Sequence, residues 1–180
     1  MCIMVFAERV FVSLDAAEVE VVTQVVASCE RLRLGPIARA ATRMGNGWLY
    51  PIASLVLVLA GLADPLRFLA AATSSLALAF AIYPVLKRFL RRRRPCDYDP
   101  ALVRGPAPLD RYSCPSGHAM TAAAYSVPVI AAWPMAAPVA VALWLMVSWS
   151  RVALGHHYVS DVLLGTIIGG TAAMLMMSIL

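Results

Sequence analysis

The chain has 180 residues, of which 61% are hydrophobic and 14% charged, and its mean hydropathy is +0.76. Soluble domains lie nearer half apolar and a quarter charged, so this composition argues against a soluble domain and indicates one membrane domain. Much of the positive charge behind the net +5 lies in residues 87–94, a block that suits anionic lipid headgroups or phosphate. Predicted membrane segments flank this block, so no nucleic-acid partner is expected.

Residues 1–47 lack both a signal-peptide pattern and an apolar run of the roughly 20 residues that cross a bilayer. Apolar residues recur there at steps of three or four: Phe6, Val10, Leu14, Ala17, Val21 and Val25. This period predicts an amphipathic helix that lies on the membrane surface or packs on the protein itself. Asp15 and Glu18 have the spacing of a capping box, which predicts that the helix is interrupted and restarts there.

Five apolar segments follow, and each is predicted to cross the membrane: Trp48–Leu62, Leu66–Leu86, His118–Trp133, Val139–Trp149 and Tyr158–Leu180. The expected fold class is therefore all-α. It is an integral membrane helical bundle of about five transmembrane helices (residues 48–180), preceded by the amphipathic N-terminal helical segment (residues 1–47). Small residues in the last segment predict close contact with a neighbouring helix: Gly165, Gly169 and Gly170.

Two cations stand at the end of the second segment. Lys87 and Arg94 are seven residues apart, which predicts that they project from one helix face two turns apart before Pro95 stops the helix. Two fixed cations can bind separate oxygens of one phosphoryl group, the arginine in bidentate geometry. The alternative is a positive-inside anchor of a membrane helix, which explains residues 91–93 but does not explain Lys87.

The third segment opens with Pro115-Ser116-Gly117-His118, after a loop over residues 95–115 that is rich in Pro, Gly, Asp and Arg. Free amides at a helix start form an anion site, to which the Ser116 hydroxyl adds a donor. His118 would then stand beside the anion, where a protonated imidazole can give its proton to a leaving oxygen. The alternative is a simple turn and cap.

The stretch from Ser150 to Asp161 carries an arginine, two histidines and an aspartate between two apolar segments. His157 and Asp161 are four residues apart, so on a helix the carboxylate can bond an imidazole nitrogen and orient it. An oriented imidazole near Arg151 can attack an anionic centre. The alternative is a loop with a capping aspartate, and His156 is interpreted as a structural neighbour.

These polar stretches are predicted to form one site at one membrane face. The second and fourth segments end, and the third and fifth begin, at this face, near Lys87, Ser150, His118 and His157. The four cysteines show no Cys-x-x-Cys spacing, so neither a metal nor a redox site is expected from them.

The three motifs resemble the three-part signature of the type 2 phosphatidic acid phosphatase family, which is related to vanadium haloperoxidases and bacterial non-specific acid phosphatases. They are Lys87-x6-Arg94-Pro95, Pro115-Ser116-Gly117-His118 and Ser150-Arg151-x5-His157-x3-Asp161. They match in residue type, order and spacing, and the resemblance covers about residues 48–180.

The resemblance implies a role for each site residue. His157 is the nucleophile and forms a phosphohistidine, Asp161 orients it, and His118 is the general acid. Five further groups would hold the phosphoryl oxygens: Lys87, Arg94, Ser116, the Gly117 amide and Arg151. The resemblance implies neither a metal nor a cofactor.

The expected function is a metal-independent membrane phosphatase that hydrolyses the terminal phosphate of a lipid phosphate or diphosphate among the membrane lipids. Candidate substrates are polyprenyl diphosphate or a polyprenyl-linked sugar phosphate, phosphatidylglycerol phosphate and phosphatidic acid. The alternative is a small anion or proton-coupled transporter that uses the same basic and His/Asp residues. That function predicts inverted repeats and discontinuous helices, and the sequence shows neither.

We expect an integral protein of the bacterial inner (cytoplasmic) membrane, and two arguments about the face of the site disagree. Every Lys and Arg except Arg67 falls on the site face, which by the positive-inside rule places the site in the cytoplasm. Members of the family usually have six spans and a site that faces away from the cytoplasm, whereas five are predicted here. Both orientations therefore stay open.

Overall fold

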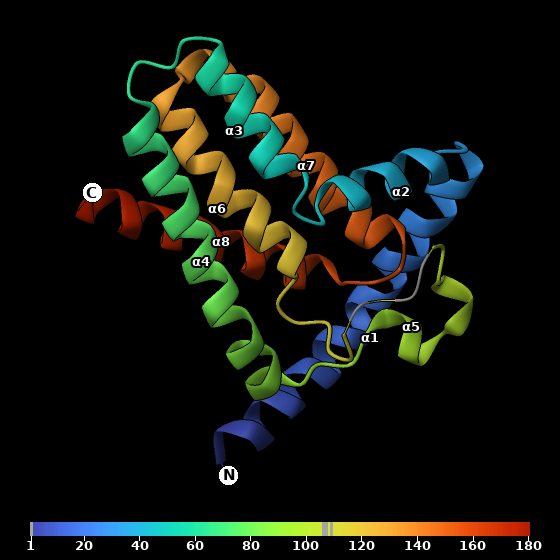
Figure 1. Cartoon of the computed structure of the whole chain (residues 1–180). Coiled ribbons are helices and arrows are strands. Elements are labelled where there is room, and N and C mark those ends of the chain that lie inside the picture. Colours follow the sequence, from blue (N-terminus) through green and yellow to red (C-terminus); the bar gives the residue numbers. More distant parts are fainter. Residues whose placement is uncertain (1, 106–107, 109) are drawn as a thin grey trace.

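The computed structural model describes the backbone of residues 2–105, 108 and 110–180, and within these ranges the side chains from Leu14 onward (Figure 1). The described residues form an all-α bundle without strands, so the predicted fold class is confirmed. The α-helices are α1 Cys2–Arg31, α2 Gly35–Met44, α3 Leu49–Leu59, α4 Pro65–Leu90, α5 Pro95–Tyr98, α6 Gly117–Ala132, α7 Ala137–Ala153 and α8 Val159–Ile179. Two single 3-10 turns, Pro100–Leu102 and Pro134–Ala136, lie between them.

Helix α6 is the centre of the bundle, and α4, α7 and α8 pack against it (Figure 1). Every residue from Ala119 to Ser126 is buried, and half of this run is alanine. Small side chains let neighbouring helix backbones approach closely, which is how membrane helices gain packing contacts without a large hydrophobic driving force. The helix that carries the second motif is therefore held on several sides.

Two of the three glycines predicted to allow close helix contact do so. A Cβ at Gly165 would lie 2.5 Å from the Ser116 carbonyl oxygen, and a Cβ at Gly169 would lie 2.0 Å from that of Met120. Helix α8 thus packs directly on the backbone of α6 and fixes the start of α6. The prediction is wrong for Gly170, which faces open space.

We expect Gly169→Ala to lower the thermal unfolding temperature of the detergent-solubilised protein, because the added methyl group must push α8 away from α6. Overpacking of this kind costs about 1–3 kcal/mol. Gly170→Ala is the matched control, since it makes the same change one residue away in open space. Alanine favours a helix over glycine, so the control should unfold at the same or a higher temperature. Equal losses for the two variants would show that α8 does not rest on α6 in this register.

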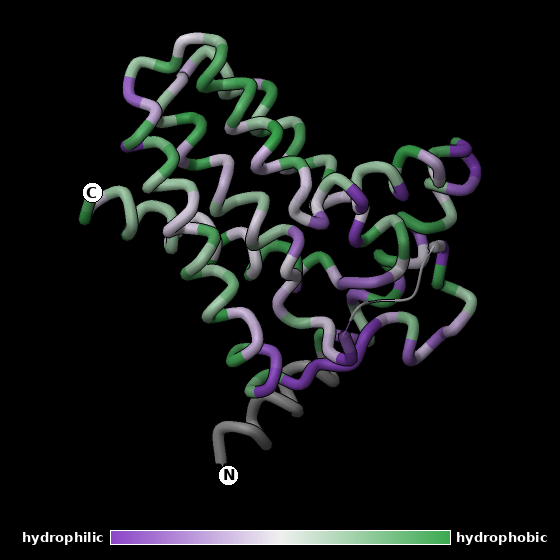
Figure 2. The backbone as a smooth tube through the Cα atoms, in the orientation of Figure 1, coloured by the Kyte–Doolittle hydropathy of each residue, from purple (hydrophilic) through white to green (hydrophobic). Residues whose placement is uncertain are grey.

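Among the described residues, three stretches are long and apolar enough to cross a membrane: Pro65–Tyr98, Pro134–Ala153 and Val159–Ile179. The other two predicted spans correspond to α3, which is apolar but has 11 residues, and to α6, which is surrounded by other helices. Figure 2 shows hydrophobic residues along most of α3, α4 and α8, and hydrophilic residues where α4 ends and in the segment that follows. The polar segments after α4 therefore lie beyond one end of the apolar helices.

Helix α4 ends sooner than predicted. Its last residue is Leu90, and Arg91 follows in the left-handed conformation, with φ 49°, as the C-cap. Lys87 and Arg94 therefore do not share a helix face, and the predicted two-turn spacing is wrong. The left-handed residue Arg91 ends the helix, yet the side chains of Lys87 and Arg94 still reach the same site.

The arginines of residues 91–94 alternate in exposure. Arg92 and Arg94 are buried, whereas Arg91 and Arg93 are exposed, as is usual for a non-helical chain in which successive side chains point to opposite sides. The interpretation of residues 91–93 as a simple positive-inside anchor is therefore wrong for Arg92.

Helix α1 runs without a break from Cys2 to Arg31, so the predicted interruption near Asp15 is wrong. Its carboxylates at Asp15 and Glu18 bind a partner in another part of the chain instead of capping a new helix start. A cap satisfies amides at a helix end, and in the middle of a continuous helix those amides already bond within the helix.

Helix α1 also packs on the protein, against α4, α5 and α7. Its buried stripe differs from the predicted one and consists of Asp15, Val22, Val26 and Cys29. The predicted apolar stripe is exposed at Leu14, Ala17 and Val21, while the side chains of Phe6 and Val10 lie outside the described residues. The helix thus has two apolar stripes, one of which joins the core with Leu102, Ala119, Val152 and Tyr158.

Candidate active site

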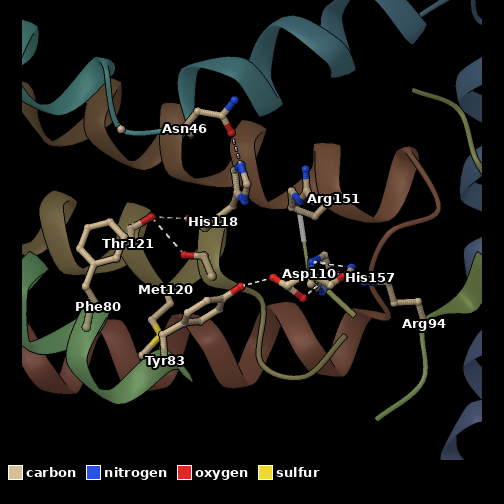
Figure 3. A pocket seen from close by; sticks show the side chains of 14 residues that line it. Asn46, Phe80, Tyr83, Arg94, Asp110, His118, Met120, Thr121, Arg151 and His157 are labelled. Atoms are coloured by element: carbon tan, nitrogen blue, oxygen red, sulfur yellow. Dashed lines mark hydrogen bonds and ion pairs between the residues drawn. The ribbon is translucent and has the colours of Figure 1, made fainter. Parts of the chain in front are cut away.

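A cavity of about 350 Å³ opens between α4, α6, the end of α7 and the linker that precedes α3 (Figure 3). Five of the eight predicted site residues line it: Arg94, Gly117, His118, Arg151 and His157. The other three, Lys87, Ser116 and Asp161, lie behind this lining and bond or adjoin it. The structure therefore brings all eight together from the three motifs.

The His157 ring is buried, and its two nitrogens have different surroundings. Nε2 lies 3.3 Å from Nη1 of Arg94, and Nδ1 lies 3.6 Å from Oδ2 of Asp161. A guanidinium can only donate, so Nε2 carries the lone pair and the ring proton is on Nδ1, on the side of Asp161. Burial and the positive charges of Arg94, Arg151 and Lys87 hold the pKa of His157 well below its usual value. The imidazole is therefore neutral, and its Nε2 electron pair faces the cavity and accepts from Arg94.

Asp161 does not make the predicted hydrogen bond to His157. Helix α8 begins at Val159, two residues after His157, so the pair does not share a helical turn, and 3.6 Å is longer than a hydrogen bond. The carboxylate is fixed by two other donors. Its Oδ2 accepts from the backbone N–H of Tyr158 at 3.0 Å, and its Oδ1 accepts from Nη1 of Arg92 at 2.8 Å.

The loop before α6 supplies an acid that no sequence motif indicated. Oδ1 of Asp110 accepts hydrogen bonds from Lys87 Nζ at 2.5 Å and from Arg94 Nη2 at 2.7 Å, and its Oδ2 accepts one from the Tyr83 hydroxyl. Burial acts to raise the pKa of Asp110, but the hydrogen bonds from Lys87 and Tyr83 and the charges of Lys87 and Arg94 lower it to about 2. The ionised Asp110 carboxylate thus binds Lys87 and Arg94, the two cations predicted to bind phosphate.

We expect Asp110→Asn to lower the KM of the substrate and to tighten competitive inhibition by inorganic anions. The neutral amide no longer competes for Lys87 and Arg94, and a charged hydrogen bond lost by the competing state corresponds to about tenfold in affinity. Asp99→Asn removes the same charge from an exposed position in the same connecting segment and should change neither constant. A weaker anion affinity in Asp110→Asn would show instead that the carboxylate holds the two cations in place for the substrate.

The start of α6 offers further donors to the cavity. The hydroxyl of Ser116 is buried and has no hydrogen-bond partner among the described residues. The first amides of the helix have no intrahelical acceptor, so they too can bond an anion. Glycine is required next to them, because a Cβ at Gly117 would lie 2.6 Å from the Tyr83 ring. The ring of Tyr83 therefore lies directly against the place where α6 begins.

Helix α2 and the residues after it complete the other wall. The Thr42 hydroxyl accepts from Nη1 of Arg151 at 2.6 Å. Oδ1 of Asn46 lies 2.8 Å from Nε2 of His118 (Figure 3). An amide oxygen can only accept, so His118 carries a proton on Nε2. Neither Thr42 nor Asn46 belongs to a motif, so no sequence pattern indicated these partners.

His156 is buried and holds Arg94 through its main chain. Its carbonyl oxygen accepts from Nη1 of Arg94 at 2.6 Å, next to the contact of the same nitrogen with His157. A carbonyl group is present whatever the side chain, so this contact agrees with the interpretation of His156 as a structural neighbour.

The order and spacing of these residues match a known family. The sequence model of the PAP2 superfamily matches residues 68–180, which include all three motifs. The chain belongs to the PAP2 superfamily. Helices α1 to α3, with Thr42 and Asn46, precede the segment that the PAP2 model matches.

Known PAP2 proteins resemble the chain in sequence and in fold. Decaprenylphosphoryl-5-phosphoribose phosphatase from two strains of Mycobacterium tuberculosis, CDC 1551 / Oshkosh and H37Rv, is 34% identical over 102 residues, or 57% of this chain. The aligned part is 55% of the relative, so the chain spans about half the length of the curated relatives it matches.

Two crystal structures share the fold over nearly the whole chain. The PAP2-type phosphatidylglycerolphosphate phosphatase of Bacillus subtilis has a TM-score of 0.68 and 22% identity, and the alignment covers 99% of this chain and 96% of that one. Aquifex aeolicus LpxE has a TM-score of 0.72 and 17% identity, with 90% and 95% coverage. At these identities the likeness establishes the fold of a PAP2 membrane protein.

Proposed function

We propose that this PAP2 protein is a metal-independent phosphatase that removes the terminal phosphate of a lipid phosphate or diphosphate through a phosphohistidine. The observation that carries the proposal is the surroundings of Nε2 of His157. A neutral, buried imidazole turns its lone pair toward a cavity on which Arg94, Arg151 and Lys87 converge. A nucleophile among cations is what attack on an anionic phosphorus requires.

In the first step, Nε2 of His157 attacks phosphorus and the bond from phosphorus to the lipid oxygen breaks. His118 enters this step as the imidazolium, a form that the negative charge of the bound phosphate favours. The leaving oxygen takes the proton from Nε2 of His118, replacing Asn46 as the acceptor of that hydrogen bond, and the neutral ring keeps its other proton. Asp161 stabilises the positive charge that spreads to the Nδ1 side of the His157 ring.

In the second step, water attacks the phosphohistidine. His118, now without its extra proton, takes a proton from this water, the bond from phosphorus to nitrogen breaks, and inorganic phosphate leaves. Both histidines return to their starting states. During both steps the charge on the phosphoryl oxygens is held by Lys87, Arg94 and Arg151, together with the Ser116 hydroxyl and the first amides of α6.

These cations supply the charge stabilisation for which many phosphatases use a metal ion. The Asp110 carboxylate supports this role, because an anion of the chain itself already binds Lys87 and Arg94. A phosphoryl group carries more negative charge and more acceptor oxygens than a carboxylate, so it can displace Asp110 from the same donors.

The substrate class we favour is a polyprenyl-linked sugar phosphate. The relatives that are 34% identical are phosphatases of such a lipid, and the cavity continues from its polar end to an apolar wall of Ala79, Phe80 and Met120. Polyprenyl diphosphate, phosphatidylglycerol phosphate and phosphatidic acid are the competing substrates. Apolar contacts discriminate chain length weakly, so the headgroup must carry most of the choice.

The decisive experiment is phosphate release by the purified protein from each of these four lipid classes. We expect release from the polyprenyl-linked substrate, unchanged activity in excess chelator and inhibition by vanadate, which can adopt the five-coordinate shape of the attacked phosphorus. Activity that chelator abolishes and a divalent metal restores would contradict the mechanism. Absence of phosphate release from all four classes would contradict the proposed function.

A further inference from the structure

Arg92 lies behind the catalytic pair and is buried at the meeting point of three carboxylates. Its Nη1 donates to Asp161 at 2.8 Å, its Nε donates to Asp15 at 2.8 Å, and its Nη2 donates to Glu18 at 2.7 Å. Its guanidinium also stacks on the Tyr158 ring at 4.0 Å. All of its edges are therefore engaged, and two of the acids come from α1.

The backbone explains why two arginines reach the catalytic pair from one short segment. Because exposure alternates after the end of α4, Arg92 and Arg94 both point inward. Arg94 contacts Nε2 of His157, whereas Arg92 contacts the carboxylate of Asp161. The two guanidiniums thus hold the nucleophile and its partner acid from opposite ends.

The hydrogen bonds of Asp161 show what Arg92 does. Arg92 binds Oδ1 of Asp161 and the Tyr158 amide binds Oδ2, and this pair of contacts leaves Oδ2 on the side of His157 Nδ1. A planar guanidinium fixes a carboxylate oxygen in a defined direction, which a flexible ammonium does not. The position of Oδ2, and with it the direction of the imidazole, therefore depends on Arg92.

Two acids of helix α1 weaken the electrostatic effect of Arg92 on Asp161. Asp15 and Glu18 share the positive charge of Arg92, so the charge of Asp161 is not fully neutralised and stays available to the His157 ring. Glu18 also accepts from the Ser160 amide at 2.8 Å, which ties α1 to the first turn of α8. The acids of α1 thus act on the same turn of chain that carries Asp161.

We infer that Arg92 is a positioning residue for the Asp161–His157 pair, and that α1 is part of this device through Asp15 and Glu18. The inference rests on the proposed function, in which His157 is the nucleophile. It assigns a catalytic purpose to a helix that lies outside the segment matched by the PAP2 model.

The test compares Arg92→Gln, Arg92→Lys and the exposed neighbour Arg93→Gln. We expect Arg92→Gln to lower kcat by about tenfold to a hundredfold, as for other residues that orient an active-site group, with little change in KM because the phosphate-binding cations are intact. Arg92→Lys keeps the charge and should recover part of the loss. Arg93→Gln should behave as the unmodified protein.

A double-mutant cycle separates positioning from a loss of structure. In an Asp161→Asn background, Arg92→Gln should cost less than about threefold, because the group through which it acts has been changed. The same factor in both backgrounds, or a fall in kcat that follows the loss of folded protein, overturns the inference. If Arg92→Gln does not fold, Glu18→Gln is measured in the same cycle. A fall in kcat that occurs when Asp161 is present but not in Asp161→Asn supports the role of α1, and an equal fall in both overturns it.

A readout without turnover keeps the inference distinct from the proposed function. Nitrogen NMR of labelled histidine should show the Nδ1–H resonance of His157 shifted in Arg92→Gln and unchanged in Arg93→Gln. An unshifted resonance overturns the inference even if the protein hydrolyses lipid phosphates. A shifted resonance in a protein that releases no phosphate supports the positioning role and rejects the proposed function alone.

Discussion

Replacing His157 with alanine is expected to reduce phosphate release by more than about a thousandfold while the bundle stays folded. The covalent route then has no nucleophile, because His156, the adjacent buried histidine, contacts Arg94 through its main-chain carbonyl and is not among the residues that line the cavity. Single-turnover assays should show no phosphorylated protein. The folded state is checked by the thermal unfolding temperature, which should be nearly unchanged.

His156→Ala is the matched control, since it removes an adjacent buried imidazole and leaves the carbonyl oxygen in place. It should keep most of the activity. Near-normal turnover in His157→Ala together with an inactive His156→Ala would show that the nucleophile is assigned to the wrong residue.

Arg94→Ala is expected to cost about a hundredfold to a thousandfold in kcat, as for the loss of one donor to the developing charge. Arg94 bonds Asp110, the His156 carbonyl and Nε2 of His157, so its loss removes a phosphate contact and also frees the imidazole. Arg93→Ala removes the neighbouring exposed charge and should have little effect. Similar losses in the two variants would indicate a general effect of surface charge.

The same variant should change the pH profile. Burial and the charge of Arg94 both lower the pKa of His157, so removing that charge lets the pKa rise toward its usual value. The imidazole is then protonated at a higher pH than before, and a protonated ring cannot attack. The acid limb of kcat/KM, measured between about pH 4 and 8, should therefore move to higher pH in Arg94→Ala. A limb that stays in place would show that Arg94 does not set the charge state of His157.

Much of the fold could be predicted because apolar length is a local property. Each of the five apolar segments became a helix, and their ends differ from the predicted ones by a few residues. How deeply each helix lies in the bundle could not be predicted from apolar length. Helix α6 is as apolar as a membrane span, yet it is surrounded by other helices, and only the packing of α4, α7 and α8 decides that.

The site motifs could be located because their spacing is specific, but their local geometry could not. Lys87 and Arg94 were expected on one helix face, and a single left-handed residue at Arg91 separates them into a helix and an irregular segment. The same turn buries Arg92, which the sequence presents as one of four identical residues. Nothing in a run of arginines shows which of them will point inward.

The partners contributed by distant parts of the chain could not be predicted at all. Asn46 and Asp110 line the cavity from a linker and a loop, and Thr42 of α2 bonds Arg151 behind it, and no period or motif singles out any of the three. Asp15 and Glu18 did stand out, but their spacing fits a local cap as well as a shared distant partner. The difference lies in tertiary contacts that a local pattern does not contain.

The bonds between α1 and α8 have a consequence for the order in which the protein matures. Glu18 and Ser160 are 142 residues apart in sequence, and Arg92 joins both to the same cluster. Contacts of such separation form late, since the loop between them must close first. During synthesis Glu18 can therefore pair with Arg92 early, but its bonds to Ser160 must wait until the start of α8 has been made. A chain halted before α8 would keep its cation cluster and His157 but lack Asp161 and Ser160, so the proposed catalytic pair is complete only when the first and last helices meet.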